Sequence, residues 1–292
     1  MKSAIVTGAD GFIGTHLVRL LCEKGVDVTA LCLPDSSTSN RLPEDVSVVH
    51  KMGQLPQADA FFHLAWASPS GAGRADAGVQ ARNITLTIDA IKAAKECGAK
   101  FIGLGTIYER FAKNVMESGQ FSNPNFYILS KHFASEMSSQ FAYQNDMQYV
   151  WCQICHPIGR FIKREQLMAY VVSGLLGGKP PALGSASTYF DIIAVEDVAL
   201  ALYLIAECDN ARRGYFIGSG TPLVLRDYLE KVRGVLGVEA PLLYNQRAED
   251  GLSFSKEWFN IGDLCDDTGF CPGVSFENAV ENVKEWILES GL

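Results

Sequence analysis

Residues 3–21 read Ser-Ala-Ile-Val-Thr-Gly-Ala-Asp-Gly-Phe-Ile-Gly-Thr-His-Leu-Val-Arg-Leu-Leu, and this stretch decides the fold. A short apolar run precedes the glycines, and after them apolar residues recur at helical spacing. The stretch therefore predicts a strand, a glycine turn and a helix. At such a turn the N–H groups of the first helical turn point outward, and the helix dipole adds partial positive charge. We expect the pyrophosphate of a dinucleotide to bind there.

The glycines of this turn have separate roles in this interpretation. Gly8 makes the turn, Gly11 lets the backbone approach the phosphates, and Gly14 allows the helix to pack closely on the strand. The spacing is GxxGxxG rather than GxGxxG, and a plain strand-to-helix turn would also explain it. Other residues must therefore support the assignment. The expected cofactor contacts from this turn are Gly8, Asp10, Gly11, Phe12, Ile13 and Gly14.

Size and charge limit the possible functions. The 292 residues suffice for one large α/β domain or for a core domain with a smaller lobe. The net charge of −8 disfavours a nucleic-acid or acidic-membrane surface, because binding to phosphate backbones is mostly electrostatic. No apolar run approaches the roughly 18 residues of a membrane span, and no signal-peptide core precedes the first strand. We expect a soluble, cytoplasmic protein.

The cysteines and histidines give no sign of a metal site. Of the eight cysteines, only Cys152 and Cys155 are closely spaced, and they lie in an apolar run without a second pair or a histidine cluster nearby. We expect buried, reduced thiols and no bound metal.

Strands and helices alternate along the first half of the chain. This alternation predicts parallel strands joined by right-handed crossovers, with ligands outside the carboxyl ends of the strands. Beyond Gly159 the alternation fades, which indicates an added lobe. Strands are predicted at 26–33, 60–66, 100–106 and 149–155, a helix at 83–95, a turn and a helix at 123–143, and further helices at 167–181 and 276–288.

The predicted fold class is therefore α/β, a Rossmann-like doubly wound parallel sheet with a smaller, mostly C-terminal substrate lobe. We expect a dinucleotide-binding domain at 1–160, with 189–218 returning to it, and a substrate-binding lobe at 161–188 and 219–292.

The tip of the second predicted strand should hold the adenosine ribose. NAD-binding folds usually place an acidic residue there for the 2′-hydroxyl, whereas a nearby Arg suits the 2′-phosphate of NADP. This chain has Cys32 and Leu33 at the tip, with Asp35 and Arg41 just beyond. The predicted cofactor is NAD or NADP, with a slight preference for NADP because no carboxylate at the tip would repel a 2′-phosphate.

Tyr127 and Lys131 are four residues apart, on one face of a predicted helix. An ammonium near a phenol lowers the phenol's pKa from about 10 toward neutrality, so the tyrosine can act as acid or base at a carbinol or carbonyl. Such a pair alone usually marks a solvated helix face. After a dinucleotide-type turn, a hydride-transfer site becomes the better interpretation.

Together these motifs resemble the extended short-chain dehydrogenase/reductase family, in its nucleotide-sugar epimerase/dehydratase group. The resemblance covers nearly all of the chain. The matching motifs are Thr7-Gly8-x-x-Gly11-x-x-Gly14, His63-Leu64-Ala65, Asn83, Gly105-Thr106, Tyr127-x-x-x-Lys131, His156-Pro157-x-Gly159, Asp191-Ile192-Ile193-x-Val195-x-Asp197-Val198-Ala199 and Gly269-Phe270-x-Pro272.

The resemblance implies roles for the matched residues. Tyr127 would be the acid/base, Lys131 its electrostatic partner and a ribose ligand, and Thr106 the hydroxyl that bonds the reacting oxygen. It also implies a possible homodimer through the helix that carries Tyr127. Further cofactor contacts would come from Cys32, Gln54, Leu55, Leu64, Ala65, Trp66, Asn83, Lys131 and Pro157. Substrate contacts would come from Ser68, Thr106, His156 and Phe190.

The chain departs from the group's pattern at substrate-facing positions. The segment after Thr106 is about two residues shorter than usual, and Ile107 and Tyr108 stand where dehydratases of the group have Asp and Glu, which disfavours dehydration. The usual Asn before Pro157 is His156, and the usual diphosphate-binding Arg is Phe190. Candidate replacements for that Arg are Arg160, Lys163, Arg164, Arg226 and Arg247.

The favoured function is NAD(P)-dependent hydride transfer at a sugar carbon, by a nucleotide-sugar 4-epimerase or a 4-keto-sugar reductase. One alternative is a catalytically weak, dinucleotide-sensing regulatory protein, which the irregular segment after Thr106 supports. Another is a reductase of a non-sugar ketone, which is compatible with Phe190 and Trp66.

Overall fold

The computed structural model describes residues 1–119, 122, 124–248 and 251–291, and the chain forms two compact units. The predicted functional division at residue 160 stays a prediction, because the units are defined by packing alone. Unit 1 comprises Met1–Ile154, Ala199–Ile217 and Gly262–Phe270, and unit 2 comprises Cys155–Val198, Gly218–Ile261 and Cys271–Leu292.

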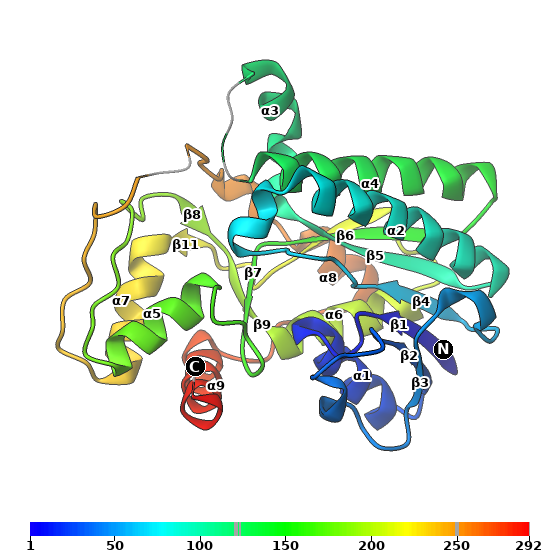
Figure 1. Ribbon diagram of the computed structural model, residues 1–292, viewed down its shortest axis with the longest axis horizontal. Coiled ribbons are helices and arrows are strands. Elements are labelled where there is room, and N and C mark those ends of the chain that lie inside the picture. The colour runs from blue at the N-terminus through cyan, green and yellow to red at the C-terminus, as the bar shows by residue number, and fades with distance from the viewer. Residues whose placement is uncertain (120–121, 123, 249–250, 292) are drawn as a thin grey trace. The chain divides into compact units, whose positions relative to one another are not determined.

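Unit 1 is built on a seven-stranded sheet with the order β10-β6-β5-β4-β1-β2-β3, in which every neighbouring pair is parallel (Figure 1). The chain order reverses at β1, which has β2 on one side and β4 on the other. Ligands of open α/β sheets bind beyond the strand ends at such a reversal. The predicted fold class is confirmed. The strands are β1 (Ser3–Thr7), β2 (Asp27–Leu31), β3 (Ser47–Val49), β4 (Ala60–His63), β5 (Lys100–Thr106), β6 (Tyr149–Ile154) and β10 (Gly214–Ile217).

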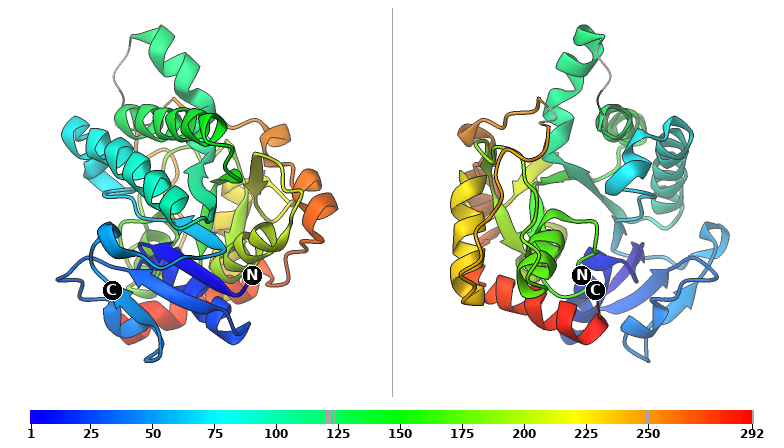
Figure 2. Two further views of the ribbon diagram at one scale, coloured as in Figure 1. Left: turned by 90° about the vertical axis from the view of Figure 1, so that its right-hand side faces the viewer. Right: turned by 60° about the vertical axis from the view of Figure 1, so that its left-hand side comes forward.

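Helices cover both faces of this sheet. Helices α2 and α4 run side by side over one face in Figure 1 and in both views of Figure 2, with α1 on the opposite face. α2 begins six residues before its predicted start because the Asp76 carboxylate accepts a hydrogen bond of 2.9 Å from the Val79 N–H. The helices are α1 (Phe12–Glu23), α2 (Ala77–Glu96), α3 (Ala112–Ser118), α4 (Asn125–Gln144), α6 (Val195–Glu207) and α8 (Gly262–Thr268). Residue 123, in the turn predicted before α4, lies outside the described residues.

An aromatic row makes the core beneath α2 and α4 rigid. Phe61 of β4 stacks on Phe101 of β5 at 6.1 Å between ring centres, and Phe101 stacks on Tyr149 of β6 at 5.8 Å. These rings pack with Ile91 and Ala94 of α2. Large buried aromatic side chains contribute strongly to core stability, so this row fixes the strands whose ends carry the site.

Unit 2 combines short strands with three packed helices. Strands β7 and β9 pair in parallel, and β8 and β11 are antiparallel. The Asp197 carboxylate accepts hydrogen bonds of 2.9 and 3.0 Å from the backbone N–H groups of Gly273 and Val274, which fixes the segment before α9. The elements are β7 (His156–Ile158), α5 (Leu167–Leu176), β8 (Tyr189–Phe190), β9 (Ile192–Ala194), β11 (Leu223–Val224), α7 (Leu225–Leu236) and α9 (Phe276–Ser290).

Across the described part of the chain, no helix has both the length and the apolar character needed to span a membrane.

Candidate active site

The glycine turn after β1 is closely packed on the end of β4. Gly8 has φ +65°, and a Cβ on it would lie 3.0 Å from the backbone of Ala65. A Cβ on Gly14 would lie 2.1 Å from the carbonyl oxygen of Gly8, so only glycine fits where α1 starts. No side chain caps this end of α1, and its first turn holds no acidic residue. The described turn therefore offers its N–H groups and positive dipole end to an anion.

A buried chain of hydrogen bonds joins β1, β4 and α2 below this turn. The Thr7 hydroxyl accepts from the Ala65 N–H at 3.2 Å and lies 3.0 Å from His63 Nδ1. His63 Nε2 in turn lies 3.0 Å from the Thr87 hydroxyl. Burial, with the charge of Lys131, lowers the pKa of His63 to about 3. This histidine is neutral and structural, and the predicted strand 60–66 ends at it because Leu64 and Ala65 turn to bond Thr7.

Helix α2 holds the loop after β4. The Asn83 side chain accepts from the Ala67 N–H and donates to the Ala67 carbonyl, both at 2.9 Å. Gln80 accepts a hydrogen bond of 3.0 Å from the Trp66 indole and donates to the Ser68 carbonyl at 3.1 Å. Asn83 therefore has a defined role as a loop anchor, and its predicted proximity to cofactor phosphates stays a prediction.

A carboxylate lies at the C-terminal tip of β2, and it comes from a residue outside this strand. The Asp10 carboxylate, from the glycine turn, accepts hydrogen bonds from the hydroxyls of Ser36 and Thr38, the latter at 3.1 Å. Burial, reinforced by the Asp10 charge, raises the pKa of Cys32 to about 11. The Asp10 charge also opposes the lowering of the Arg41 pKa by burial. Asp10 and Arg41 are thus both at the predicted ribose position.

Tyr127 of α4 and Thr106 at the end of β5 are the predicted acid/base and its hydroxyl partner. Both side chains are buried, and the Thr106 hydroxyl lowers the pKa of the Tyr127 phenol. Burial raises the pKa of Tyr127, whereas the Arg74 charge and hydrogen bonds from Thr106 and Arg74 lower it. The Arg74 guanidinium carbon lies 4.5 Å from the centre of the Tyr127 ring. A buried phenol with a hydroxyl and a cation beside it is suited to acid/base chemistry.

Lys131, one helical turn beyond Tyr127, is deeply buried. Its ammonium donates a hydrogen bond of 2.6 Å to the Leu104 carbonyl and lies 3.8 Å from the centre of the Trp66 ring. Burial lowers the pKa of Lys131 to about 7, although the charge of Glu109 raises it. Trp66 also meets the Tyr127 ring edge-on, with ring centres 6.2 Å apart. Trp66 therefore contacts both members of the predicted pair.

The short segment after Thr106 is an ordered 3₁₀ turn, Ile107–Phe111, rather than an irregular loop. Glu109 accepts a hydrogen bond of 2.6 Å from the Thr106 N–H, and the Thr106 hydroxyl accepts from the Tyr108 N–H at 3.4 Å. This reciprocal capping box fixes the end of β5. Ile107 and Tyr108 are buried side chains without carboxylates.

Two residues of this site, Arg74 and Glu109, were not predicted. The Thr106-x-x-Glu109 spacing is a capping-box signature that could have indicated Glu109. Arg74 lies in a Gly- and Ser-rich loop with no periodic pattern, so no sequence signal marks it. Its Nε donates to the Pro69 carbonyl at 2.7 Å, which orients the guanidinium.

The remaining predicted residues belong to other elements, and one side chain lies outside the described part of the chain. Leu55 follows a short 3₁₀ turn, and the side chain of Gln54 lies outside what the structure describes. In unit 2, Pro157 lies on β7, and the His156 and Phe190 rings are 4.5 Å apart. Phe190 is only 6% exposed and packs against Phe254 at 5.4 Å. Phe190 is thus mainly a core residue of unit 2.

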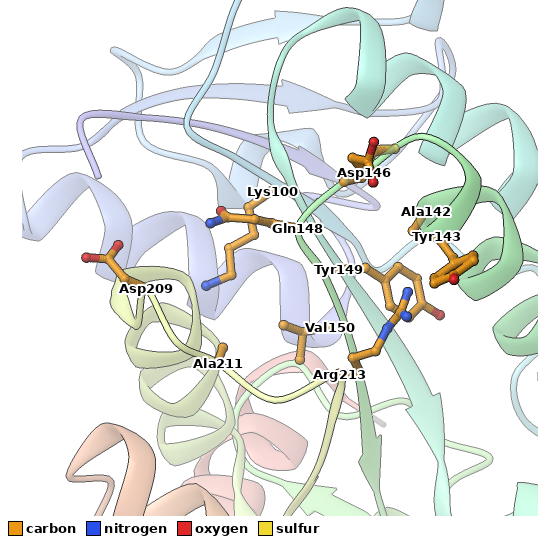
Figure 3. A pocket seen from close by; sticks show the side chains of 11 residues that line it. Lys100, Ala142, Tyr143, Asp146, Gln148, Tyr149, Val150, Asp209, Ala211 and Arg213 are labelled. Atoms are coloured by element: carbon orange, nitrogen blue, oxygen red, sulfur yellow. The ribbon is translucent and has the colours of Figure 1, made fainter.

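A surface hollow of about 320 Å³ lies at the amino ends of the strands, whereas the glycine turn follows the carboxyl end of β1. It is lined by residues at the amino ends of β5, β6 and β10, among them Lys100, Tyr149 and Arg213 (Figure 3). The Lys100 ammonium is already bonded to the carbonyls of Ile205 and Cys208, at 2.8 and 2.6 Å. Because ligands of parallel α/β sheets bind at the carboxyl ends of the strands, this hollow is not the candidate active site.

Metal-binding chemistry finds no support in the described residues, where no three His, Cys, Asp or Glu side chains are grouped as ligands. Burial raises the pKa of Cys152 to about 12 and also raises that of Cys155. Both thiols are therefore protonated and unreactive at neutral pH.

Residues 4–218 match a family model described as the NAD dependent epimerase/dehydratase family. A dTDP-glucose 4,6-dehydratase from Haemophilus influenzae is 24% identical over 99% of this chain and 98% of its own length. A CDP-abequose synthase from Salmonella muenchen is 24% identical over 80% of each chain.

Solved structures share the fold. A UDP-N-acetylglucosamine 4-epimerase from Methanobrevibacter ruminantium, in complex with UDP-N-acetylmuramic acid, has a TM-score of 0.84 at 22% identity over 99% of both chains. The Bordetella bronchiseptica enzyme WbmF, in complex with NAD⁺, has a TM-score of 0.79 at 22% identity over 99% of this chain and 93% of its own.

Proposed function

The chain belongs to the NAD dependent epimerase/dehydratase family, and from that premise we propose that it transfers hydride at a carbon of a nucleotide-activated sugar, as a 4-epimerase or a 4-keto-sugar reductase. The observation that carries this proposal is the buried Tyr127 phenol, which is in contact with the Arg74 cation and whose pKa both Arg74 and Thr106 lower. A protein that only binds a dinucleotide has no need of an acid/base phenol.

The glycine turn fits a dinucleotide. The uncapped start of α1 would hold the pyrophosphate, and Asp10 would bond the adenosine ribose. The predicted contacts of Leu64, Ala65 and Trp66 with the rest of the cofactor remain part of this proposal. When bound, the nicotinamide would supply or accept hydride at the sugar carbon.

Tyr127 moves the proton in the proposed reaction. In the oxidative direction the phenolate takes the proton of the sugar hydroxyl, and in the reductive direction the phenol returns it to the oxygen. Thr106 positions that oxygen through its hydroxyl. Arg74 supplies positive charge that favours the phenolate. A step of water loss is not proposed, because Ile107 and Tyr108 provide no carboxylates after Thr106.

NAD is the proposed cofactor, in place of the slight sequence-based preference for NADP. That preference depended on the missing carboxylate at the tip of β2. Asp10 brings a carboxylate to this position, where it would bond ribose hydroxyls in place of Ser36 and Thr38 and repel a 2′-phosphate. One relative by structure, the WbmF enzyme, was solved both with NAD⁺ and with NADH, which supports this choice.

The proposed substrate class rests on basic residues of unit 2 and on the relatives. Two guanidinium groups are held there by aromatic rings, Arg226 at 4.2 Å from the Tyr244 ring and Arg247 at 5.1 Å from the Tyr170 ring. They are the proposed diphosphate ligands in place of the family's usual Arg, whose position Phe190 occupies, because a guanidinium suits a phosphate oxygen pair. Arg160 is a poorer candidate since it pairs with Glu289. Similar proteins are a UDP-N-acetylglucosamine 4-epimerase and a CDP-abequose synthase.

A homodimer through α4 is proposed as well. Phe133 and Met137 are 42% and 51% exposed, and four-residue spacing puts them on one face of that helix. Light scattering after gel filtration tests this, and a monomeric mass at micromolar concentration would contradict it.

The experiment for the main proposal incubates the protein with NAD(H) or NADP(H) and a panel of UDP-, dTDP-, CDP- and GDP-sugars and their 4-keto forms. An epimerase converts the sugar without net change of the cofactor, whereas a reductase oxidises the cofactor in step with product formation.

Tyr127→Phe should lower turnover by orders of magnitude and leave dinucleotide binding intact. Tyr143→Phe, on the exposed side of the same helix, is the matched control. Intact dinucleotide binding without turnover on any panel member would instead favour the dinucleotide-sensing alternative.

A further inference from the structure

Glu109 is a buried carboxylate at the candidate active site that the proposed reaction does not use. It is only 6% exposed, and each of its carboxylate oxygens accepts at least one hydrogen bond. Oε1 accepts from the Thr106 N–H at 2.6 Å, and Oε2 accepts from the Trp151 indole at 3.0 Å and from the Gln153 amide at 3.3 Å. A helix cap needs only the first of these bonds. The two donors from β6 show that the site is built around a carboxylate.

The backbone of β5 makes room for this carboxylate. A Cβ on Gly105 would lie 2.3 Å from Glu109 Oε1 and 2.2 Å from the Trp151 indole nitrogen. Residue 105 must therefore be glycine for Glu109 and Trp151 to meet. Burying a carboxylate is costly unless it is paired and hydrogen-bonded, so a fully enclosed one calls for a nearby cation.

That cation is Lys131. Its ammonium lies 5.9 Å from the centre of the same Trp151 ring that donates to Glu109. Lys131 has one short bond, to the Leu104 carbonyl, and otherwise faces aromatic carbon, so water does little to keep it charged. Its charge must be maintained by another group.

We propose that Glu109 is a positioning residue of the hydride-transfer site, whose carboxylate keeps Lys131 protonated and holds Thr106 in place beside Tyr127. The expected effect on turnover rests on the proposed function. The expected effect on the protonation of Lys131 does not depend on any substrate. Lys131 then keeps its charge at neutral pH only while Glu109 is ionised.

The pKa directions agree with this arrangement. Burial raises the pKa of Glu109, while the hydrogen bond from Thr106 and the charge of Lys131 lower it. The titratable or charged groups that face it are Lys131 and Tyr127 from α4, Tyr149 from β6 and Arg110 from the 3₁₀ turn. Burial brings the pKa of Lys131 to about 7 even with Glu109 present, so loss of the carboxylate must lower it further.

Glu109→Gln tests the proposal, because it removes the charge and keeps an acceptor for the Thr106 N–H. The first readout is the lysine side-chain NMR titration of the isotope-labelled protein, with the Lys131 signal assigned by its loss in Lys131→Met. We expect the midpoint of Lys131 to fall by about one pH unit or more. In the reductive direction the alkaline limb of the kcat profile should also move down, because the charge of Glu109 raises the pKa of the Tyr127 phenol and its removal lowers that pKa. Glu117→Gln, an exposed acid paired with Lys113 on α3, is the matched control.

Gln153→Leu is a milder second variant in case Glu109→Gln does not fold. It removes one donor to Glu109 Oε2, and we expect a smaller shift of the Lys131 midpoint in the same direction. An unchanged Lys131 midpoint in the folded variants overturns the proposal, even if turnover falls. If the Lys131 midpoint shifts but the protein turns over no sugar, the coupling between Glu109 and Lys131 stands. That result contradicts only the proposed function.

Discussion

The guanidinium carbon of Arg74 lies 4.5 Å from the centre of the Tyr127 ring, and the charge of Arg74 lowers the pKa of the phenol. From the sequence, Lys131 was expected to be the cation that tunes this phenol. In the structure the Lys131 ammonium faces the Leu104 carbonyl and the Trp66 ring instead. Arg74 is therefore the positive group in direct contact with the proposed acid/base.

Replacement of Arg74 tests that role. We expect Arg74→Met to lower kcat about 10- to 100-fold, because the phenolate loses its contacting cation. Arg74→Lys should recover part of the loss, since it restores charge without the forked donor. Dinucleotide affinity, measured by calorimetry, should stay near the wild-type value. Arg82→Met, the same change at an exposed position of α2, is the control. A normal kcat in Arg74→Met would show that Arg74 does not act on Tyr127.

The sequence predicted what depends on local pattern. The strand Lys100–Thr106 was predicted with the bounds that the structure has, because its residues form an uninterrupted run between a helix end and a turn. The Tyr127/Lys131 pair was placed on one helix by spacing alone. Such features require only the periodicity of one element.

The unpredicted features depend on contacts between distant segments. Asp10 receives hydrogen bonds from residues 26 and 28 positions later, so its place at the tip of β2 is invisible in the linear order. Arg74 is positioned by a loop whose Ser68 and Gly73 carbonyls accept from Gln80 of α2. The environment of Glu109 combines β5, β6 and α4. A resemblance to a family cannot supply residues that the family pattern lacks.

Asp10 should determine the choice between NAD and NADP. A carboxylate at the ribose position repels a 2′-phosphate, and Arg41 nearby would attract one once that carboxylate is neutralised. We expect Asp10→Asn to raise the ratio of kcat/KM for NADP to that for NAD by about tenfold or more. Asp35→Asn, in the exposed loop that follows β2, serves as control. Equal ratios in wild type and Asp10→Asn would place the ribose elsewhere.

Gly14→Ala should damage the turn that binds the pyrophosphate. The added Cβ would lie 2.1 Å from the Gly8 carbonyl oxygen and 2.8 Å from that of Ala9, so the backbone must move. We expect a loss of about 1–3 kcal/mol in unfolding free energy, measured by urea denaturation, together with weaker dinucleotide binding. Gly234→Ala, in α7, meets no atom within 4 Å and should be neutral or stabilising by about 0.5–1 kcal/mol. Similar behaviour of the two variants would contradict the close packing at Gly14.

His63 should make the stability of the protein sensitive to acid. Burial lowers its pKa from 6.5 in the unfolded chain to about 3 in the folded one, so between these values the unfolded state binds more protons. The free energy of unfolding therefore falls as the pH drops from 6.5 toward 3, with a slope of up to about 1.4 kcal/mol per pH unit from this group. His63→Asn should be less stable at pH 7 by about 1–3 kcal/mol, because the Thr7 and Thr87 hydroxyls lose their hydrogen bonds to the imidazole. The slope of its unfolding free energy against pH between 3 and 6.5 should nevertheless be smaller, by an amount that corresponds to nearly one bound proton.

Ser138→Ala, which removes a buried hydroxyl bonded to Ala134 and Tyr149, should lower stability and keep the wild-type slope. If urea unfolding between pH 3 and 6.5 gives His63→Asn the same slope as wild type, the buried histidine titrates normally and the Thr7–His63–Thr87 chain is not the rigid support of the glycine turn.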